Sequence, residues 1–486
     1  MPLVPLGTIP ERNAARLGPD RWAVRHGDAV ATWGELADRS RRRANALATM
    51  GVAEGDRVVL ALPNGNAFYE WTFALWQLGA TPTVVSPRLP APELRAIVDL
   101  AQPRVVIADD PALQAALGAL PMAFGRDHGD ARPLPPRVAP SWKAMTSGGS
   151  TGRPKLIVDA LPAAFPDDLR TSRLPADGVL LNPGPLYHNF PFAMTHSALL
   201  HGNAVVGMVR FDAAELLRLV AAHRVQWLNL VPTMMQRIAR LPAAVRAAHD
   251  LSSLETVWHT AAPIAPALKR FWIDWLGGGR IWEMYGGTEG ICTTQLDGTE
   301  WLTHPGSVGR PVGGELSIRD PDGAELPPGE TGEVFLRRTG AWAAGGPSYR
   351  YVGAESRRLA DGWESLGDHG WLDADGYLYI ADRRTDLILT GGRNVYPAEV
   401  EGVLLAHPAV AEAIVIGLPD DDLGARVHAI VRLEPGAGAR ESDLRDFVRA
   451  HLVGYKVPCA IEFTAATLRD EAGKARRSAL RAERLP

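Results

Sequence analysis

The chain is poor in the features that mark several classes of protein. Only two of its 486 residues are cysteines, and Cys292 and Cys459 lie far apart without the spacing of metal ligands. A disulfide framework is therefore not expected, and a reducing, cytoplasmic setting fits best. The 51 Lys and Arg residues against 55 Asp and Glu residues give a net charge of −4. Without a basic excess, nothing points to nucleic acid as a partner.

Long apolar runs are missing as well. No stretch approaches the ~20 apolar residues that a membrane-spanning helix needs. Residues 1–10 have no basic stretch followed by a long apolar core, so they do not look like a signal peptide. The chain is long enough for two or three lobes. A soluble protein of several lobes is expected, and its substrate can still be apolar.

The most informative segment is residues 146–155, which read Thr-Ser-Gly-Gly-Ser-Thr-Gly-Arg-Pro-Lys. Glycines let backbone N–H groups turn toward one point and leave room for a bulky anion. The hydroxyls add donors, and Lys155 adds a positive charge. A flexible linker is the alternative, but linkers rarely end in Arg-Pro-Lys before an apolar, strand-like segment. The segment predicts a polyphosphate site that is not the common P-loop, because Leu156 follows the lysine where that motif has Ser or Thr.

Helical and strand patterns alternate over the first half of the chain. Alternation of this kind predicts parallel, doubly wound sheets with helices on both faces. The expected helices cover residues 34–50, 66–78 and 91–100, and the expected strands cover 56–62, 81–85, 104–108, 178–186, 204–209, 226–231 and 280–284.

The pattern changes after about residue 310. Short strands between turn residues suggest a small antiparallel barrel within about residues 305–384. The rest of the chain, 385–486, reads as a compact α+β unit of normal small-domain size, so the large N-terminal domain is expected to span 1–384. The strands and helices expected in these two parts are 314–319, 332–337, 376–380, 411–416 and 426–433 (strands) and 441–451 and 478–484 (helices).

A second motif, Tyr-Gly-Gly-Thr-Glu-Gly at 285–290, follows one of the expected strands. Ligands of open α/β sheets bind beyond the carboxyl ends of strands. A tyrosine there can stack on a purine, a threonine can donate to a phosphate, and a glutamate can hold Mg²⁺. Taken alone, the segment would be an ordinary turn.

Together the two motifs resemble the phosphate loop and the Tyr-Gly-x-Thr-Glu motif of the adenylate-forming enzymes, which include acyl-CoA synthetases, luciferases and peptide-synthetase adenylation domains. The extra glycine in the loop resembles the bile-acid-type CoA ligases. The resemblance extends over essentially the whole chain and implies an α/β fold with a mobile C-terminal lid domain. Further segments that match the family, in the same order, are 185–188, 259–263, 363–368, 382–401 and 472–477.

The resemblance assigns a role to each motif residue. Tyr285 would contact adenine, Asp368 the two ribose hydroxyls, Thr288 the α-phosphate and Glu289 the Mg²⁺ ion. Lys474 would bridge the carboxylate and the α-phosphate, and it joins His188, Thr288 and Glu289 as the candidate catalytic residues. The full set of nucleotide-binding candidates is Thr146, Ser147, Gly148, Gly149, Ser150, Thr151, Gly152, Lys155, Ala262, Pro263, Tyr285, Gly286, Asp368 and Arg383.

The acyl and thiol sites follow from the same resemblance. His188 would gate or orient the substrate, although outside this context a structural histidine would be favoured. His259 stands where the family usually has glycine and would face the acyl pocket, unless it is a surface-loop histidine. Gly391 and Gly392 would let the backbone approach coenzyme A, and Thr385 takes the hinge position. The acyl-pocket candidates are Tyr187, Asn189, Phe190, Met194, His259 and Gly287, with Phe192 from the same segment.

The implied function is an acyl-CoA ligase that uses ATP, Mg²⁺ and coenzyme A. It would form an acyl-AMP and then a thioester, and a bulky polycyclic, terpenoid- or steroid-like acid is expected as its substrate. Two acids, Asp470 and Glu471, lie close to Lys474 and suggest that adenylation is impaired, which would leave mainly the thioester step. A carrier protein as the acyl acceptor, a noncatalytic nucleotide-binding protein and a homodimer remain open alternatives.

Overall fold

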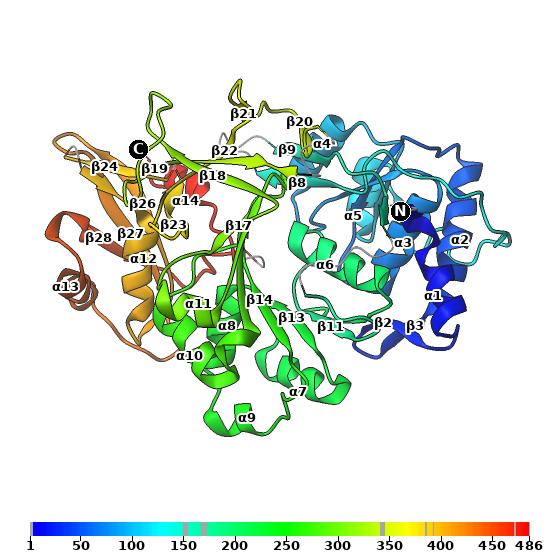
Figure 1. Cartoon of the computed structure of the whole chain (residues 1–486), viewed down its shortest axis with the longest axis horizontal. Coiled ribbons are helices and arrows are strands. Elements are labelled where there is room, and N and C mark those ends of the chain that lie inside the picture. The colour runs from blue at the N-terminus through cyan, green and yellow to red at the C-terminus, as the bar shows by residue number, and fades with distance from the viewer. Residues whose placement is uncertain are drawn as a thin grey trace.

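The computed structural model describes residues 3–148, 154–166, 173–340, 346–383, 386–391, 393–470 and 473–485. Two large mixed sheets, a smaller antiparallel sheet and a C-terminal α+β unit make up this part of the chain (Figure 1). A short pair, β1 (Leu3–Pro5) with β10 (Ala164–Pro166), ties down the N-terminus. No helix in the described ranges has both the length and the apolar character to cross a membrane.

The first large sheet has seven strands in the order β20-β9-β8-β5-β4-β6-β7. The strands from β4 to β8 pair in parallel, as the alternating pattern predicts, and β9 and β20 extend the sheet antiparallel. The strands are β4 (Arg57–Ala61), β5 (Thr81–Val84), β6 (Val105–Ala108), β7 (Leu120–Pro121), β8 (Ala144–Gly148), β9 (Pro154–Asp159) and β20 (Tyr349–Val352). The helices that alternate with them are α2 (Trp33–Thr49), α3 (Asn66–Gln77), α4 (Ala91–Ala101) and α5 (Pro111–Leu117).

The second large sheet has nine strands in the order β17-β16-β15-β14-β13-β11-β12-β2-β3, and the strands from β15 to β2 are parallel. Its strands are β2 (Trp22–His26), β3 (Ala29–Thr32), β11 (Val179–Asn182), β12 (Ala204–Gly207), β13 (Trp227–Leu230), β14 (Thr256–His259), β15 (Ile281–Gly286), β16 (Thr293–Asp297) and β17 (Arg310–Val312). The helices around it are α1 (Ile9–Leu17), α6 (Asn189–Leu200), α7 (Ala213–His223), α8 (Pro232–Ala239), α9 (Ala243–Ala247), α10 (Pro266–Leu276) and α11 (Gly298–Thr303), with 3₁₀ turns η1 (Leu6–Thr8) and η2 (Gly278–Arg280).

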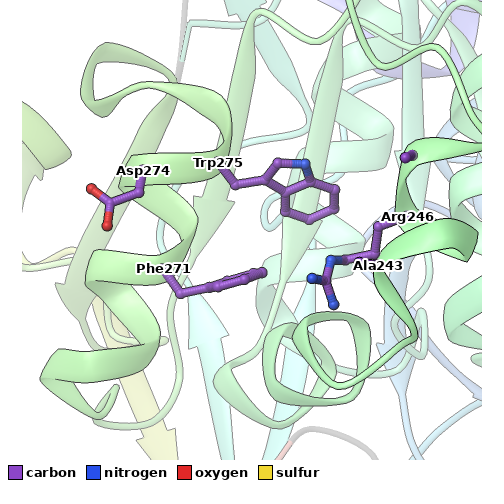
Figure 2. A pocket seen from close by; sticks show the side chains of 6 residues that line it. Ala243, Arg246, Phe271, Asp274 and Trp275 are labelled. Atoms are coloured by element: carbon purple, nitrogen blue, oxygen red, sulfur yellow. The ribbon is translucent and has the colours of Figure 1, made fainter.

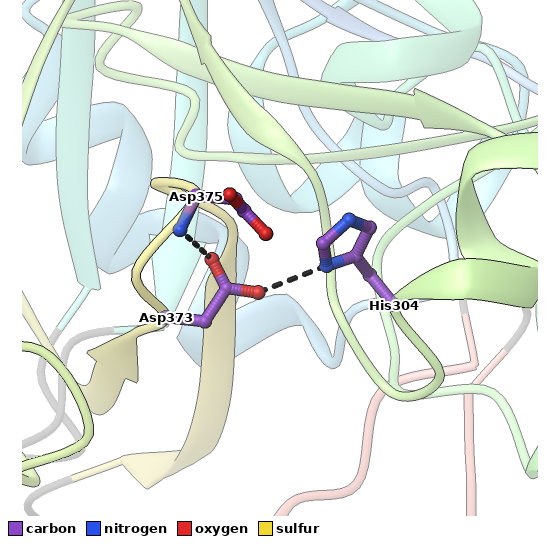
Figure 3. A group of neighbouring side chains, drawn as sticks. All are labelled: His304, Asp373 and Asp375. Carbon is purple, nitrogen blue, oxygen red and sulfur yellow. Dashed lines mark hydrogen bonds and ion pairs between the residues drawn. The ribbon is translucent and has the colours of Figure 1, made fainter.

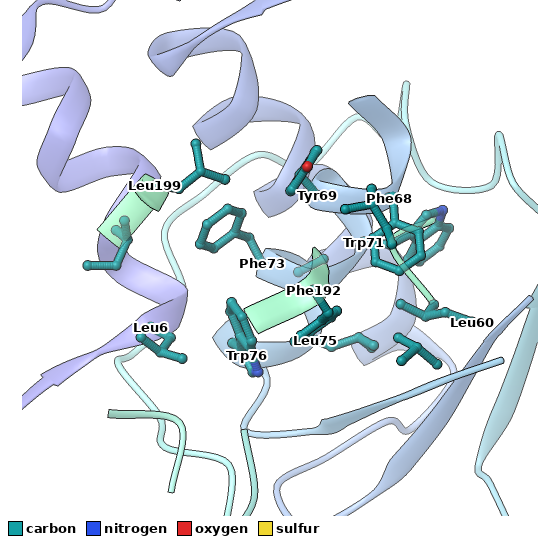
Figure 4. Packing of buried hydrophobic residues seen from close by; sticks show 14 of the residues in the cluster. Leu6, Leu60, Phe68, Tyr69, Trp71, Phe73, Leu75, Trp76, Phe192 and Leu199 are labelled. Atoms are coloured by element: carbon teal, nitrogen blue, oxygen red, sulfur yellow. The ribbon is translucent and has the colours of Figure 1, made fainter. Parts of the chain in front are cut away.

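Helices of both halves share one aromatic core between the large sheets (Figure 4). The N-terminus of α2 is fixed by a capping box in which Thr32 and Glu35 exchange side-chain hydrogen bonds. Helix α3 is buried over nearly its whole length. Phe192 of α6 is fully buried, with its ring 6.2 Å from that of Phe68 and 6.3 Å from that of Trp76. It is therefore a core residue, which corrects its expected place in the acyl cavity.

The antiparallel strands expected after residue 310 form a five-stranded sheet, in which β19 lies between β18 and β22, and β21 and β23 both pair with β22. Two strands from the same region, β17 and β20, instead join the large sheets. The region 305–384 thus contributes strands to both large sheets of the N-terminal domain. The five strands are β18 (Gly314–Arg319), β19 (Gly332–Arg338), β21 (Arg357–Arg358), β22 (Glu364–Leu372) and β23 (Leu378–Arg383).

The C-terminal unit has its own core, formed by residues between 388 and 461, and appears at the left of Figure 1 in orange and red. The strands and helices expected here are present, and α12 is an additional helix over the Pro-x-Glu-x-Glu segment. The elements are β24 (Ile388–Thr390), β25 (Arg393–Val395), α12 (Pro397–Ala406), β26 (Val410–Asp420), β27 (Gly424–Leu433), α13 (Glu441–His451), η4 (Gly454–Lys456), β28 (Ala460–Phe463) and α14 (Arg477–Ala482).

Candidate active site

The two ends of the glycine-rich segment lie in neighbouring strands. β8 and β9 pair antiparallel as far as Gly148 and Pro154. The hydroxyl of Thr146 donates to the carbonyl of Val84 at 3.5 Å, which anchors the start of the loop to β5. Six candidates lie outside the described residues: Gly149, Ser150, Thr151, Gly152, Thr385 and Gly392.

The end of this loop meets the second motif. The Nζ atom of Lys155 lies 3.7 Å from Oε1 of Glu289 and 3.8 Å from the ring centroid of Tyr351. The phenol of Tyr351 donates a 2.6 Å hydrogen bond to the same Oε1. Glu289 is buried, so a cation, a carboxylate and a phenol share one enclosed position. Sequence analysis singled out Lys155 and Glu289 but missed Tyr351, which lies in a short strand without a motif.

The adenine and ribose candidates also meet. Tyr285, at the end of β15, donates a 2.6 Å hydrogen bond from its phenol to Oδ2 of Asp368. Asp368 is buried in β22, where its backbone pairs with Arg383 of β23. A carboxylate accepts several hydrogen bonds, which suits a ribose diol. The structure therefore brings Tyr285, Asp368 and the backbone of Arg383 to one place.

The segment after β14 contains an unusual backbone. Ala261 has a φ of +76°, a conformation that a residue with a side chain adopts at a cost of roughly 1–2 kcal/mol. The hydroxyl of Thr260 donates to the carbonyl of Met284 at 2.8 Å, which ties this loop to β15 just before Tyr285. Ala262 and Pro263, the adenine-side candidates, follow directly. Such a backbone outlier is a feature of ligand-binding loops.

His259 is fully buried, so its interpretation as a surface-loop histidine is wrong. Its Nε2 atom lies 3.7 Å from Oε2 of Glu283, which forms a 2.5 Å ion pair with Lys269 of α10. Burial, and then the charge of Lys269, hold the pKa of His259 well below its usual value. Neighbouring Trp258 packs on the opposite sheet face with Trp282, since side chains alternate along a strand. His259 thus faces α10 and not α6.

The acyl-pocket candidates on α6 face the second sheet. Phe190 and Met194 pack against the aromatic core between the sheets, and the Phe190 ring lies 6.3 Å from that of Trp227. His188 occupies the N-cap position of α6 without a capping hydrogen bond from its side chain, and its ring lies 4.9 Å from that of Tyr187. The Oδ1 atom of Asn189 is enclosed and accepts no hydrogen bond within the described parts of the chain.

Gly287 has a direct steric role. A Cβ atom at this position would lie 2.5 Å from Oε2 of Glu289 and 2.6 Å from Cδ1 of Leu366. Glycine therefore lets the Glu289 carboxylate take the position that is observed. Gly286, the preceding residue, closes β15 and is exposed.

The candidate catalytic lysine lies on a loop held by Asp470. The N–H of Lys474 donates to Oδ1 of Asp470 at 2.9 Å, and the N–H of Asp470 donates to the carbonyl of Lys474 at 2.9 Å. A Cβ atom on Gly473 would lie 3.5 Å from the Thr233 hydroxyl and 3.7 Å from Val231. The loop therefore approaches the N-terminal domain at the start of α8.

Buried acids hold both ends of this loop. Glu401 of α12 accepts hydrogen bonds from Arg469 at 2.9 Å and from Arg477 at 2.7 Å. Arg477 also donates to Asp386 at 2.9 Å, beside the expected hinge. Glu412 accepts from the N–H of Leu468 at 2.7 Å. The Pro-x-Glu-x-Glu segment was recognised in the sequence, but its contacts with the lysine loop were not.

Contacts across the domain boundary come mainly from α8. Arg240 forms an ion pair with Glu434 and donates to the carbonyl of Val410 at 2.9 Å. Arg237 lies 3.9 Å from Glu412. Gly391, expected beside coenzyme A, has a φ of +53° and donates its N–H to the carbonyl of Leu423 within the C-terminal unit.

Two other features involve no motif residue. Figure 2 shows a pocket between α9 and α10, where the guanidinium of Arg246 lies 5.1 Å from the ring of Phe271. Arg246 also donates to the carbonyls of Ala239 and Leu241, so its role is structural. Figure 3 shows His304, Asp373 and Asp375, a group close enough to hold a metal. Asp373 already accepts hydrogen bonds from His304, Tyr379 and backbone N–H groups.

The residues at the motif site fit a magnesium–nucleotide complex. Oε1 of Glu289 takes both contacts with Lys155 and Tyr351, and Oε2 accepts no hydrogen bond from any described residue. Carboxylate oxygens are the protein ligands that Mg²⁺ prefers. Lys155 would face phosphate, and Tyr285 with Asp368 would face the nucleoside.

The chain is similar to known proteins over most of its length. A family model described as AMP-binding enzyme matches residues 11–345, and one described as AMP-binding enzyme C-terminal domain matches residues 399–474. A feruloyl-CoA synthase from an Amycolatopsis species is 36% identical and covers 94% of this chain and 95% of its own. The fatty acid–[acyl-carrier-protein] ligase ScoC of Streptomyces coeruleorubidus is 31% identical, with 93% and 91% covered.

Among solved structures, the o-succinylbenzoate CoA synthetase MenE of Bacillus subtilis superposes with a TM-score of 0.82 in its complex with the acyl-adenylate intermediate OSB-AMP. It is 25% identical and covers 99% of this chain and 98% of that one. The same synthetase with ATP and a magnesium ion gives a TM-score of 0.81 at 25% identity, with 97% and 99% covered.

The fold and the site together define a two-domain, adenylate-forming type of enzyme. The chain belongs to the AMP-binding enzyme family, and its relatives include ligases that act on coenzyme A and on a carrier protein.

Proposed function

We propose that the protein joins a carboxylic acid to coenzyme A in two steps. The acid's oxygen would attack the α-phosphate of ATP, releasing pyrophosphate and forming an acyl-AMP. The thiol of coenzyme A would then attack the acyl carbon and release AMP. The observation that carries this proposal is that the motif at 285–290 makes both contacts: Glu289 with Lys155 at the end of the phosphate loop, and Tyr285 with Asp368.

Each of these residues would bind or stabilise a different part of the nucleotide, the metal ion or the acid. Lys155 and the loop before it would hold the β- and γ-phosphates, while Thr288 would contact the α-phosphate. Glu289 would hold Mg²⁺, which when bound neutralises phosphate charge. Lys474 would neutralise the charge that builds up on the α-phosphate and carboxylate oxygens. His188 would orient the acid, and no nucleophilic side chain is required.

The second step would need the lysine loop to leave. Gly473 lies against α8, a position that supports an approach of Lys474 to the acid and the nucleotide. A swing of the C-terminal unit about Thr385 would remove Lys474 and bring Gly391 and Gly392 to the pantetheine arm. Hinges of this kind consist of a few residues that absorb the change in φ and ψ.

For the acid, we propose a bulky fused-ring carboxylic acid, because the extra loop glycine and the segment from 257 to 262 resemble bile-acid-type ligases. Apolar walls with few polar groups are typical of such pockets.

A hydroxylated acid with a single aromatic ring is the second candidate. Asn229 donates its amide N–H to Asn182 Oδ1, which also accepts from the N–H of Gly184, so the amide orientation is fixed. Asn229 Oδ1 and Asn189 Oδ1 are both enclosed, and no residue in the described ranges donates a hydrogen bond to either. A substrate hydroxyl could donate to either oxygen, and the feruloyl-CoA synthase relative favours this class.

The test is a panel of fused-ring acids, hydroxycinnamic acids and linear fatty acids, incubated with ATP, Mg²⁺ and coenzyme A, with mass detection of acyl-AMP and thioester. Lys474→Ala should lose roughly 100-fold or more in acyl-AMP formation and still convert a supplied acyl-AMP. If short linear acids are the best substrates, both substrate proposals fail. Phosphopantetheinyl carrier protein in place of coenzyme A separates the two acceptors.

An alternative proposal is that only the thioester step runs efficiently. It rests on Asp470 and Glu471 beside Lys474. Because the Asp470 carboxylate accepts from the backbone N–H of Lys474, its support is weaker than the sequence alone suggested. Brisk ATP–pyrophosphate exchange with a good acid would exclude it. A noncatalytic nucleotide-binding protein would show no turnover with any acid.

A further inference from the structure

Tyr351 reaches the site from a distant part of the chain. It lies on β20, which pairs antiparallel with β9 and places Tyr351 opposite Ile157 and Val352 opposite Leu156. Lys155 lies in the same strand, β9, one residue before Leu156. The register between the edge strand β20 and its neighbour β9 therefore sets the tyrosine beside the end of the phosphate loop.

The phenol of Tyr351 makes two contacts of different kinds. Its hydroxyl donates to Glu289 Oε1 at 2.6 Å, and its ring lies 3.8 Å from the Lys155 ammonium. A hydrogen bond to a carboxylate is charge-assisted, and an ammonium near an aromatic ring is attracted by it. The phenol is the donor in this pair, because an ionised carboxylate can only accept hydrogen bonds.

This arrangement fixes the orientation of the Glu289 carboxylate. Oε1 is taken by the phenol, while Oε2 lies against Gly287, where a Cβ atom would be 2.5 Å away. Without the phenol, Lys155 and Glu289 would be free to close their 3.7 Å separation to direct contact. A tight pair would take the lysine from phosphate and the carboxylate from the cation.

We propose that Tyr351 is a positioning residue that holds Glu289 with Oε2 free for a divalent cation and keeps Lys155 available to phosphate. The proposal rests on the proposed function, because it assumes a magnesium–nucleotide site. It assigns a role in preparing this site to a residue of β20 that lies outside the recognised motifs.

The same strand supplies a matched control. Tyr349 points to the same side as Tyr351, two residues earlier, and also donates to a buried acid, Glu364, at 3.0 Å. Glu364 accepts in addition from Arg358 at 2.7 Å and takes no part in the candidate site. The two rings lie 4.7 Å apart in an edge-to-face contact, and a phenylalanine at either position keeps its ring. Tyr349→Phe and Tyr351→Phe each remove a phenol oxygen and its hydrogen bond to a glutamate.

The experiment measures binding of a nonhydrolysable ATP analogue by calorimetry across a Mg²⁺ titration. Loss of a hydrogen bond to a charged group should raise the Mg²⁺ concentration for half-maximal binding about tenfold in Tyr351→Phe. Tyr349→Phe should leave it unchanged. Conversion of a supplied acyl-AMP to the thioester should not change in Tyr349→Phe, which shows that the control variant remains folded and active.

A double-mutant cycle separates positioning from general stability. In the Glu289→Gln background, Tyr351→Phe should cause no further shift in the Mg²⁺ requirement. Three results would each overturn the proposal. These are an equal shift in the Mg²⁺ requirement of the two tyrosine variants, no shift in Tyr351→Phe, and a Tyr351→Phe protein that does not fold. If the unaltered protein binds no ATP analogue at all, the proposed function fails; if it binds with the same Mg²⁺ dependence as Tyr351→Phe, only the role of Tyr351 fails.

Discussion

Tyr285 and Asp368 lie 83 positions apart in the chain and share a 2.6 Å hydrogen bond. The phenol donates to Oδ2, so one oxygen of the candidate ribose carboxylate is oriented before any nucleotide arrives. Tyr285 lies near the end of β15 and Asp368 in the middle of β22, and the two strands belong to different sheets. The bond therefore couples the adenine side of the site to its ribose side.

Tyr285→Phe should weaken nucleotide binding while leaving the ring that would contact adenine. Because the lost bond is to a buried carboxylate, the expected cost is about 1.5–3 kcal/mol, or roughly a tenfold to hundredfold higher KM for ATP. Steady-state kinetics in ATP and calorimetry with AMP check this. An unchanged affinity for AMP would mean that the Tyr285–Asp368 bond does not prepare the ribose site.

Acyl-AMP formation should depend more on the ability of the Asp470 side chain to accept a hydrogen bond than on its negative charge. Asp470→Asn keeps an oxygen that can accept from the N–H of Lys474, so acyl-AMP formation should stay within about threefold. Asp470→Ala removes the acceptor and should reduce it about tenfold, the effect of one hydrogen bond. Pyrophosphate exchange measures both. A large gain in Asp470→Asn would instead support repulsion by the acid.

Glu401 should carry much of the stability of the C-terminal unit. Replacing it with alanine leaves the guanidinium groups of Arg469 and Arg477 without their buried acid, at a cost of roughly 3–5 kcal/mol. Glu399→Ala, on the same helix, removes a more exposed pair with Lys456 and should cost less than about 1 kcal/mol. Hydrogen exchange over residues 393–470 compares the two variants. Equal protection of the backbone amides in the two variants would contradict the stabilising role assigned to Glu401.

Acid should destabilise the N-terminal domain through buried histidines. Burial lowers the pKa of His26 to about 4 and that of His196 to about 3. Below pH 6.5 the unfolded chain binds protons that the folded chain does not, so stability is complete above pH 6.5 and falls as the pH drops toward these values. Each histidine should cost about 2 kcal/mol between pH 6.5 and 5.

Thermal unfolding midpoints at pH 7.5 and pH 5 provide the measurement. His196→Phe removes one titrating group from the aromatic core and should reduce the drop in midpoint. His451→Gln, at an exposed position of α13, is the control and should leave the drop unchanged. Equal drops in His196→Phe and in the unaltered protein would show that His196 does not set the acid response.

Local patterns in the sequence predicted most elements closely. The helix expected over 441–451 is α13 with the same bounds, and the strand over 314–319 is β18. These segments have strong periodicity and clear turn residues, so local information decides them. Sequence analysis placed Lys155 and Glu289 in the same nucleotide site, and the structure brings them within 3.7 Å, although this contact itself was not predicted.

Other features depend on long-range packing that a sequence pattern does not carry. Phe192 looked like a pocket residue because it lies among pocket candidates, but the helical period turns it into the core. His259 lies in a fully buried strand, where alternation decides which face it takes. Tyr351 is beside Glu289 only because β20 returns to the edge of the first sheet. No local signal distinguishes it from Tyr349.

The return of β20 to β9 also determines how the chain can be divided. β20 (349–352) completes the first large sheet, and β2 with β3 (22–32) completes the second. In each case the neighbouring strand lies far away in the chain. A fragment that stops before residue 349 would expose the backbone of β9 as an open edge, which invites pairing with other chains. In the described part of the chain, the unit from 386 to 485 has its strands and its core within one continuous segment. A truncation, fusion or domain exchange at the start of this unit would leave every sheet intact, whereas an earlier cut would leave a sheet incomplete.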